Sequence, residues 1–454
     1  MMMMNKKLLL SAAVLLGAAA SLDAQVFQEG FLLNDYRLSY RYNPALMTDT
    51  DFISTGELTT NRRSNVGASN FLYPYDGGVV TFLHSSVPTK TFQEGLEKNI
   101  YFLRTLDYNM ISYGTRRGEA LHTFEANFRG VIGASAPSDI LMMLKAGTTQ
   151  SSYQLDKLRG EGDLYLELAY GYSRQISDIF SLGARVKLLV GLYSVDYNVT
   201  KFDLDISEER YHADINTELH MTDSALQFDN TDDGFVDYST MLYKGLGNRP
   251  SGGGLAVDLG LAFKPTDNLT ISASILDLGS ILWYYGNGAY STGAFDFTGF
   301  NNLQMENMNV DGIMQQLSDV KDEFISQIRP RSASKKALFK AIPFTANAGV
   351  KYAMPFYDKL TVGLIGSYTG YQWMPYWEGR FAMGIQPVDW LDLMADFGTG
   401  SYGLVFAAGG SVRVNRFRFN LGIQNGFGGT VPKSNSALKA NSKSLTFGIT
   451  YDLP

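Results

Sequence analysis

A strict alternation of apolar with small or polar residues across 252–278 constrains this chain more than any other feature. The alternation runs through 255–263, and after a short turn at 264–268 it resumes through 269–275. A period of two places successive side chains on opposite faces, which indicates β-strands rather than a helix. Two such strands joined by a short turn predict an antiparallel hairpin with one apolar and one polar face.

The phase of this pattern changes at its far end. We expect Leu276 and Leu278 to lie on the face opposite to Ile275. Such a slip predicts a β-bulge, or a strand that leaves the membrane near residues 283–285 if the apolar face meets lipid. In a membrane protein, the Trp-Tyr-Tyr sequence at 283–285 would then form an outer aromatic girdle.

The same period recurs along most of the chain. Twelve further strands are predicted at 57–70, 104–115, 119–131, 163–174, 180–192, 344–352, 360–371, 376–386, 390–397, 402–414, 417–424 and 445–453. With the hairpin the total is about 14, an even number, as single-chain bacterial barrels have. A soluble β-sandwich would also fit the composition, which includes 46 Gly, 27 Tyr and 28 Phe.

Loop lengths separate these two folds. Short connections are predicted at 116–118, 175–179, 264–268, 355–359, 387–389 and 415–416, and the long ones, at 71–103, 132–162, 193–251, 279–339 and 425–442, all fall at the other end. Outer-membrane barrels have short periplasmic turns and long outer loops. We therefore predict an all-β fold, a transmembrane antiparallel barrel of about 14 strands. Its outer loops include a helix at 308–328 and a projecting hairpin at 202–219.

The N-terminus predicts export. Lys6 and Lys7 precede an apolar stretch at 8–20 that is too short to span a bilayer, and a plausible cleavage site follows Ala24. The predicted division is a signal peptide at 1–24, a plug or hatch segment at 25–56 and the barrel at 57–454. The mature chain is expected in the outer membrane of a bacterial cell.

Composition excludes several classes of function. The chain has no Cys, so thiol catalysis, Cys-ligated metals and disulfides are excluded. A net charge of -7 without a basic stripe argues against nucleic-acid binding. With only four His and no nucleophile motif, we expect no enzyme, no catalytic residue, no metal site and no cofactor.

The polar face of the predicted strands carries charges of both signs. A lumen of mixed charge in a barrel of about 14 strands is expected to be plugged or narrow, because open aqueous channels need more strands. The opposite charges are expected to pair with one another, with a substrate path as the alternative. The candidate lumen-lining residues are Glu167, Arg185, Lys187, Asp258, Lys351, Arg380, Asp392, Asp396, Arg413 and Arg418.

Four stretches together carry a resemblance to known barrels. They are Asn43-Pro44-Ala45, residues 169–174, residues 182–191 and residues 273–283. The chain resembles an uncharacterised outer-membrane barrel family of Bacteroidota, itself related to FadL-like fatty-acid transporters and PorV-like barrels of type IX secretion. In those relatives the N-terminal segment acts as a hatch or plug inside the lumen. The resemblance implies this role for Asn43, Pro44 and Ala45.

The resemblance also implies a function. We expect a passive transporter or channel for small molecules, hydrophobic ones among them. The alternative is a non-transporting scaffold, or a partner for type IX secretion or for surface proteins. The expected partners are outer-membrane lipid and lipopolysaccharide, the barrel assembly machinery, and either a hydrophobic ligand or a secreted or surface protein.

Overall fold

The fold is taken from a computed structural model, which describes residues 31, 33, 36–222, 226–243, 249–298, 318, 329–333, 335–372, 374–401, 403–427 and 440–454. No helix within these residues is long and apolar enough to cross a membrane.

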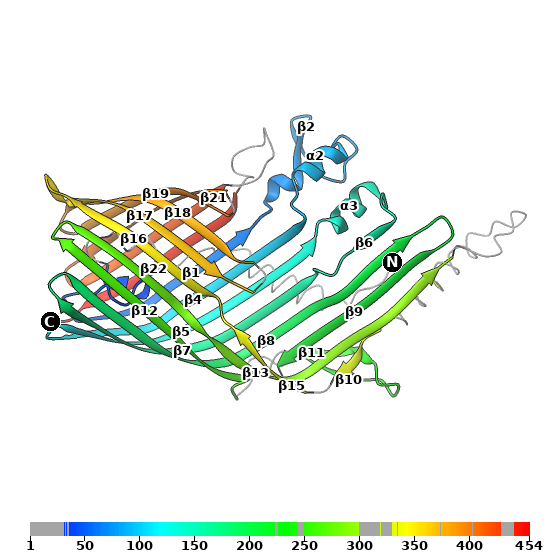
Figure 1. Ribbon diagram of the computed structural model, residues 1–454, viewed down its shortest axis with the longest axis horizontal. Coiled ribbons are helices and arrows are strands. Elements are labelled where there is room, and N and C mark those ends of the chain that lie inside the picture. Colours follow the sequence, from blue (N-terminus) through cyan, green and yellow to red (C-terminus); the bar gives the residue numbers. More distant parts are fainter. Residues whose placement is uncertain are drawn as a thin grey trace, which may run out of the picture.

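The described strands form a closed antiparallel barrel (Figure 1). Each strand pairs with the next around the ring, and the first pairs with the last. The ring contains β1 (Phe52–Ser64), β4 (Asn99–Arg117), β5 (Ala120–Pro137), β7 (Arg159–Ser177), β8 (Phe180–Ile206), β12 (Gly252–Thr266), β13 (Leu269–Phe297), β16 (Phe344–Met354), β17 (Tyr357–Gly370), β18 (Tyr376–Val388), β19 (Leu391–Gly400), β20 (Gly403–Val414), β21 (Phe417–Phe427) and β22 (Ala440–Asp452). The predicted all-β barrel of about 14 strands is thus confirmed.

The two faces of the wall differ as the alternation predicts. On β12, Leu255 is 63% exposed and Leu259 51%, whereas Asp258 between them is fully buried. Exposed apolar side chains recur in the same phase on β8, β17, β20 and β21. Because apolar residues face outward and polar residues inward, the wall is that of a transmembrane barrel rather than a soluble one.

The connections segregate to the two ends as predicted. Tight turns join β4 to β5, β7 to β8, β12 to β13, β16 to β17, β18 to β19 and β20 to β21 at one end. The other end carries β2 (Leu72–Tyr75), β3 (Gly78–Thr81), α2 (Thr89–Glu94), α3 (Asp139–Ala146), β6 (Ser152–Gln154), β9 (Tyr211–Thr222), β10 (Leu226–Asn230), β11 (Val236–Tyr243), β14 (Arg331–Ala333) and β15 (Lys336–Ala341).

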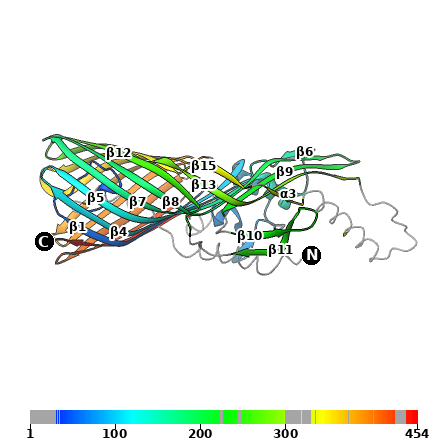
Figure 2. The ribbon, with the colours of Figure 1, turned by 90° about the horizontal axis from the view of Figure 1, so that it is seen from below.

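β8, β9 and β13 run far beyond the barrel at that end (Figure 2). β9 takes over the place of β12 between β8 and β13, so the predicted hairpin at 202–219 is part of an outer sheet. The predicted ends of β8 and β13 were therefore too early, because a bulge at Leu192 and another at Asp277 interrupt the period of two while both strands continue. The helix predicted at 308–328 lies, apart from residue 318, outside the described residues.

A bulge on β13 explains the slip in phase. Leu276 and Asp277 both lie opposite Asp258, and the backbone of Asp277 takes a left-handed conformation with φ of 61°. Leu276 is buried, as predicted, but the extra residue returns Leu278 to the exposed face, so the prediction for Leu278 was wrong.

The predicted aromatic girdle is also wrong in part. Trp283 and Tyr285 are buried on the inner face, where Trp283 packs with Ile281 and Tyr165. Of the three aromatic residues, Tyr284 alone is exposed, because β13 continues as a strand past this point instead of leaving the wall.

The described residues before β1 lie inside the barrel and belong to no strand. They include a short 3-10 helix, η2 (Ser39–Arg41), drawn in dark blue within the barrel in Figure 1. We call residues 31–51 the N-terminal segment. β1 begins at Phe52, ahead of the predicted barrel start at 57, and the predicted signal peptide at 1–24 lies outside the described residues.

Candidate functional site

Asn43 bonds directly to the backbone of the wall. Its side-chain amide donates to the carbonyls of Leu261 on β12 and Ala273 on β13, both at 3.0 Å. Its side-chain oxygen accepts from the backbone N–H of Ala45 at 2.9 Å, which closes the turn around Pro44. The Asn43 side chain is completely buried, so all of its hydrogen bonds lie inside the barrel.

Two glycines of the wall make room for this turn. A Cβ atom at Gly260 would lie 2.1 Å from the Asn43 side-chain oxygen, and one at Gly183 would lie 2.3 Å from the Pro44 carbonyl. Because real Cβ atoms do not approach this closely, any other residue at either position would displace the turn. We call Gly183 and Gly260 the glycine seat.

Polar side chains of the wall bind the backbone of the N-terminal segment. The hydroxyl of Ser173 donates to the carbonyl of Pro44, and that of Ser274 donates to the carbonyl of Tyr42 at 2.8 Å. The Lys351 ammonium donates to the carbonyl of Leu33 at 3.3 Å. These bonds satisfy backbone carbonyls that would otherwise be buried without a partner, as a segment outside any sheet requires.

The segment also bonds the strands that close the ring. Arg37 lies 2.8 Å from the carboxylate of Asp452 on β22, which Arg418 of β21 also contacts at 2.9 Å. Further down the segment, the Asp51 carboxylate accepts from the Thr115 hydroxyl at 2.8 Å. The N-terminal segment is thereby fixed to both sides of the β1–β22 seam.

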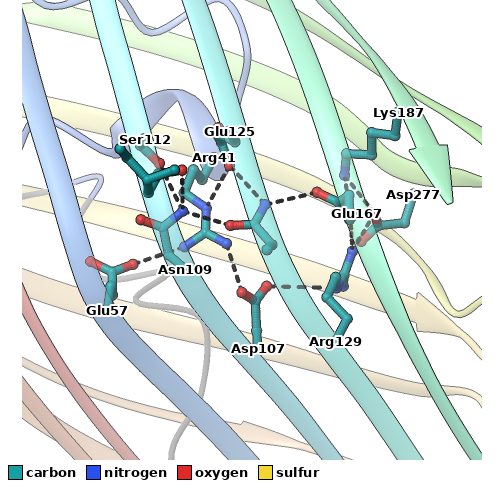
Figure 3. A network of polar contacts seen from close by, with 12 residues as sticks. Arg41, Glu57, Asp107, Asn109, Ser112, Glu125, Arg129, Glu167, Lys187 and Asp277 are labelled. Atoms are coloured by element: carbon teal, nitrogen blue, oxygen red, sulfur yellow. Dashed lines mark hydrogen bonds and ion pairs between the residues drawn. The ribbon is translucent and has the colours of Figure 1, made fainter. Parts of the chain in front are cut away.

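Arg41 is the centre of a buried network of ion pairs (Figure 3). Its guanidinium lies 3.0 Å from Glu57, 2.8 Å from Asp107 and 3.4 Å from Glu125, on β1, β4 and β5. The Tyr36 hydroxyl donates to Glu57 at 2.9 Å. A guanidinium presents five donors in a fork, which suits it to several carboxylates at once. Arg41 thus connects the N-terminal segment to three strands.

The network continues through cations of the wall. Arg129 on β5 lies 2.8 Å from Glu167 and 2.6 Å from Asp277. Lys187 on β8 contacts Asp277 at 2.5 Å. Arg129 also lies 3.6 Å from Asp107, which joins the cations of the wall to the carboxylates around Arg41.

Arg185 and Asn127 complete the network. Arg185 lies 2.8 Å from Glu125 and 2.9 Å from Asp258. The amide of Asn127 donates to Glu125 and to Glu167, both at 3.0 Å. Breaking a buried pair of this kind leaves an uncompensated charge, so the network favours one position of the segment over all others.

A separate group of ion pairs connects β18 and β19 with β1. Arg380 contacts Glu378 at 2.6 Å and Asp396 at 3.5 Å, and Arg63 contacts Glu378 at 2.8 Å. Charged side chains therefore enter the lumen from β18 and β19 as well as from the strands around Arg41.

The structure places eight of the sequence-predicted lumen residues in buried positions, namely Glu167, Arg185, Lys187, Asp258, Arg380, Asp392, Asp396 and Arg418. Lys351 is half-buried. Arg413 shares the inward phase but is exposed, because it lies at the very end of β20 beside the turn.

Sequence reasoning missed several members of the network. Asp107, Glu125 and Arg129 occupy inward positions of two strands that were predicted, so the same alternation could have found them. Asp277 was hidden by the bulge. Arg41 precedes the Asn-Pro-Ala turn in a stretch without periodicity, and no sequence signal marks its role.

A search of curated proteins gives no match. Among solved structures, the toluene transporter TbuX of Ralstonia pickettii is similar at 10% identity and a TM-score of 0.47, covering 92% of this chain and 93% of that one. The toluene transporter TodX of Pseudomonas putida is similar at 10% identity and a TM-score of 0.45, covering 95% and 98%.

A FadL homologue of Pseudomonas aeruginosa is similar at 14% identity and a TM-score of 0.44, covering 93% of this chain and 95% of that one. The fold described above rests on the pairing of the strands themselves and not on these likenesses. The model of a family of unknown function, DUF5723, matches residues 44–423, from Pro44 in the N-terminal segment to Ile423 in β21. Because this match spans most of the chain, the protein belongs to the DUF5723 family.

Proposed function

We propose that this protein is an outer-membrane barrel that passes small molecules through a lumen gated by the N-terminal segment. The observation that carries the proposal is how the segment is held. Side chains such as Asn43 and Arg41 fix it inside the ring, yet its described residues pair with no strand. It can therefore leave the lumen without breaking the hydrogen bonds of the wall.

The outer membrane is the location that suits such a wall. Lipid offers no hydrogen bonds, so a spanning β-structure must be closed, with apolar side chains outside. The exposed Leu255 and Leu259 and the closed β1–β22 seam meet both conditions. Heat-modifiable migration of the protein from an outer-membrane fraction tests this, and recovery of the protein as a soluble periplasmic species would contradict it.

The inner wall does not suit hydrophobic cargo. Arg41, Arg129, Lys187 and their carboxylate partners occupy the space directly beside the N-terminal segment. An apolar solute passing here would separate these charges from their partners without replacing the lost contacts. We therefore propose polar solutes, in place of the hydrophobic ones that the family resemblance suggests.

Conductance of the purified barrel in planar bilayers tests the gating. Deletion of residues 25–47 removes Arg37, Arg41 and the Asn43 turn but keeps Asp51 and its bond to Thr115. We expect the full-length protein to conduct rarely and the deletion variant to conduct continuously. Equal conductance of the two, with both folded by heat-modifiable migration, would contradict a gate.

The alternative, a scaffold for another protein, is favoured by the outer sheet. β8, β9 and β13 project well beyond the barrel, which passage of small molecules does not require (Figure 2). The hairpin of this sheet is tied by Lys201, which donates to Asp214 at 2.7 Å. This bond raises the pKa of Lys201 and lowers that of Asp214.

Co-purification from native membranes distinguishes the two functions. A scaffold loses its partner when residues 203–214 of the hairpin are removed, while its conductance is unchanged. A channel without such a partner co-purifies with the same proteins before and after this deletion.

A further inference from the structure

A cavity of about 110 Å³ lies in the lumen beside the N-terminal segment. Arg41 and Tyr42 border it from the segment, and Pro343 together with residues of β1, β4, β5, β7, β8, β13, β16, β17 and β18 forms the rest of its lining. The lining contains two chemically distinct groups of side chains, one charged and one neutral.

The charged group is already satisfied. Arg41, Arg129 and Lys187 border the cavity, and each lies within hydrogen-bond distance of at least one carboxylate. Asp107 and Asp277, which also border it, are the carboxylates they contact. A charged solute would have to compete with these pairs, and its own charge would be left without a counter-charge in a buried site.

Three oxygen atoms of the neutral group are not satisfied. Thr59, Asn61 and Asn347 border the cavity and are only 3%, 7% and 5% exposed. The hydroxyl oxygen of Thr59 and the side-chain oxygens of Asn61 and Asn347 have no hydrogen-bond partner among the described residues. Buried polar atoms in native proteins nearly always have a partner, so these three oxygens point to a molecule that hydrogen-bonds there.

We propose that this cavity binds one small uncharged polyhydroxylated molecule. Hydroxyl groups can donate to the oxygens of Thr59, Asn61 and Asn347, and they add no net charge to the paired network beside them. An apolar molecule would leave the three oxygens without partners. As the substrate class of the channel this inference rests on the proposed function, whereas as a binding site it does not.

Saturation-transfer NMR on the full-length protein in nanodiscs tests the site directly, with glycerol as the probe. Glycine and 1-propanol, of similar size, test a zwitterionic and a mostly apolar occupant. We expect a signal for glycerol and a much weaker one for the other two. No signal for glycerol, which would mean that water alone fills the cavity, or a stronger signal for glycine overturns the proposal.

The variants Asn61→Leu and Asn347→Leu remove the unpartnered oxygens. Asn420→Leu is the matched control, because the side-chain oxygen of Asn420 is also buried without a partner in the described part of the chain but does not border the cavity. Since a neutral hydrogen bond contributes about 1 kcal/mol, we expect roughly fivefold weaker glycerol binding in each cavity variant. In the control we expect glycerol binding as strong as in the wild type. Equal loss in all three overturns the proposal.

Thr59→Val changes the lining with the least disturbance of the fold and serves if either Asn variant fails to migrate as a folded barrel. Proteoliposome swelling in glycerol separates the two proposals. Glycerol binding without swelling, even in the variant lacking residues 25–47, would contradict the channel but leave the binding site in place. Swelling without specific binding would contradict the site but leave the channel in place.

Discussion

At the scale of single residues, the absence of a side chain is as informative as its presence. Gly260 lies on the inner face of β12, where a Cβ atom would meet the side-chain oxygen of Asn43 and the ring of Pro44. Both partners are held in place, Asn43 by two carbonyls of the wall and Pro44 by its own ring. The strain of a larger residue therefore falls on the turn as a whole.

Gly260→Ala should displace the turn and weaken docking of the N-terminal segment by about 1–3 kcal/mol, the usual cost of overpacking. The control is Gly253→Ala on the same strand, where a Cβ atom would meet nothing within 4 Å. Limited proteolysis of the folded protein measures docking, and cleavage between residues 31 and 47 should be faster in Gly260→Ala alone. Identical cleavage rates in the two variants would show that the glycine seat is not needed.

Arg41→Met should release the segment more completely, because it leaves Glu57, Asp107 and Glu125 without their shared cation. Removing one partner of a buried ion pair costs about 3–5 kcal/mol. Adding Glu57→Gln should recover part of that loss, which urea unfolding in lipid vesicles would measure.

The control for Arg41→Met is Arg174→Met. Arg174 lies 3.6 Å from Glu119 with both side chains more than half exposed, and such surface pairs contribute about 0–1 kcal/mol. If both Arg variants are equally stable, the network does not hold the segment.

At the scale of single elements, β13 shows what alternation can and cannot predict. Its first part, with Ile271 and Ile275 outward, follows directly from the period of two. The bulge at Asp277 follows only in part, because a slip in phase locates an irregularity but does not say which residue is added. The length of β13 beyond the bulge was missed, since a break in the period of two is also what the end of a strand would give.

The bulge predicts an order of stability at position 277. Asp277 has a φ of 61°, which Gly and Asn adopt more readily than Ala. Asp277→Asn loses the charge but keeps a polar side chain and still adopts the left-handed conformation. Asp277→Gly adopts that conformation but has no side chain. Asp277→Ala loses the polar side chain and is strained in that conformation. We expect urea midpoints to fall in the order wild type, Asn, Gly, Ala. An Ala variant as stable as Asn would argue against backbone strain at the bulge.

The candidate site was less predictable than the fold for a related reason. Strand periodicity assigns a face to Glu167 or Asp258, but it cannot assign a partner to either. Partners depend on the register between strands and on a segment with no periodicity at all, in which Arg41 lies. A mixed-charge lumen could therefore be predicted from the sequence, whereas the network centred on Arg41 could not.

At the scale of the whole molecule, the depth of the apolar outer surface is open to test. Leu259 lies on the exposed face of β12, well away from the turn at its end. Leu259→Arg should destabilise the barrel by about 2–4 kcal/mol if this position is near the middle of a bilayer. Val388→Arg, at the exposed end of β18, should cost much less, and a reversed order in vesicle refolding would contradict the membrane placement.

The contact between Arg37 and Asp452 has a consequence for how the chain matures. Arg37 lies near the start of the chain and Asp452 near its end, on the strand that closes the ring against β1. During synthesis the N-terminal segment emerges before β22, so it cannot make this ion pair until β22 has been added. A growing barrel therefore stays open beside β1 until β22 is present. Chains truncated before β22 would lack the ion pair between Arg37 and Asp452.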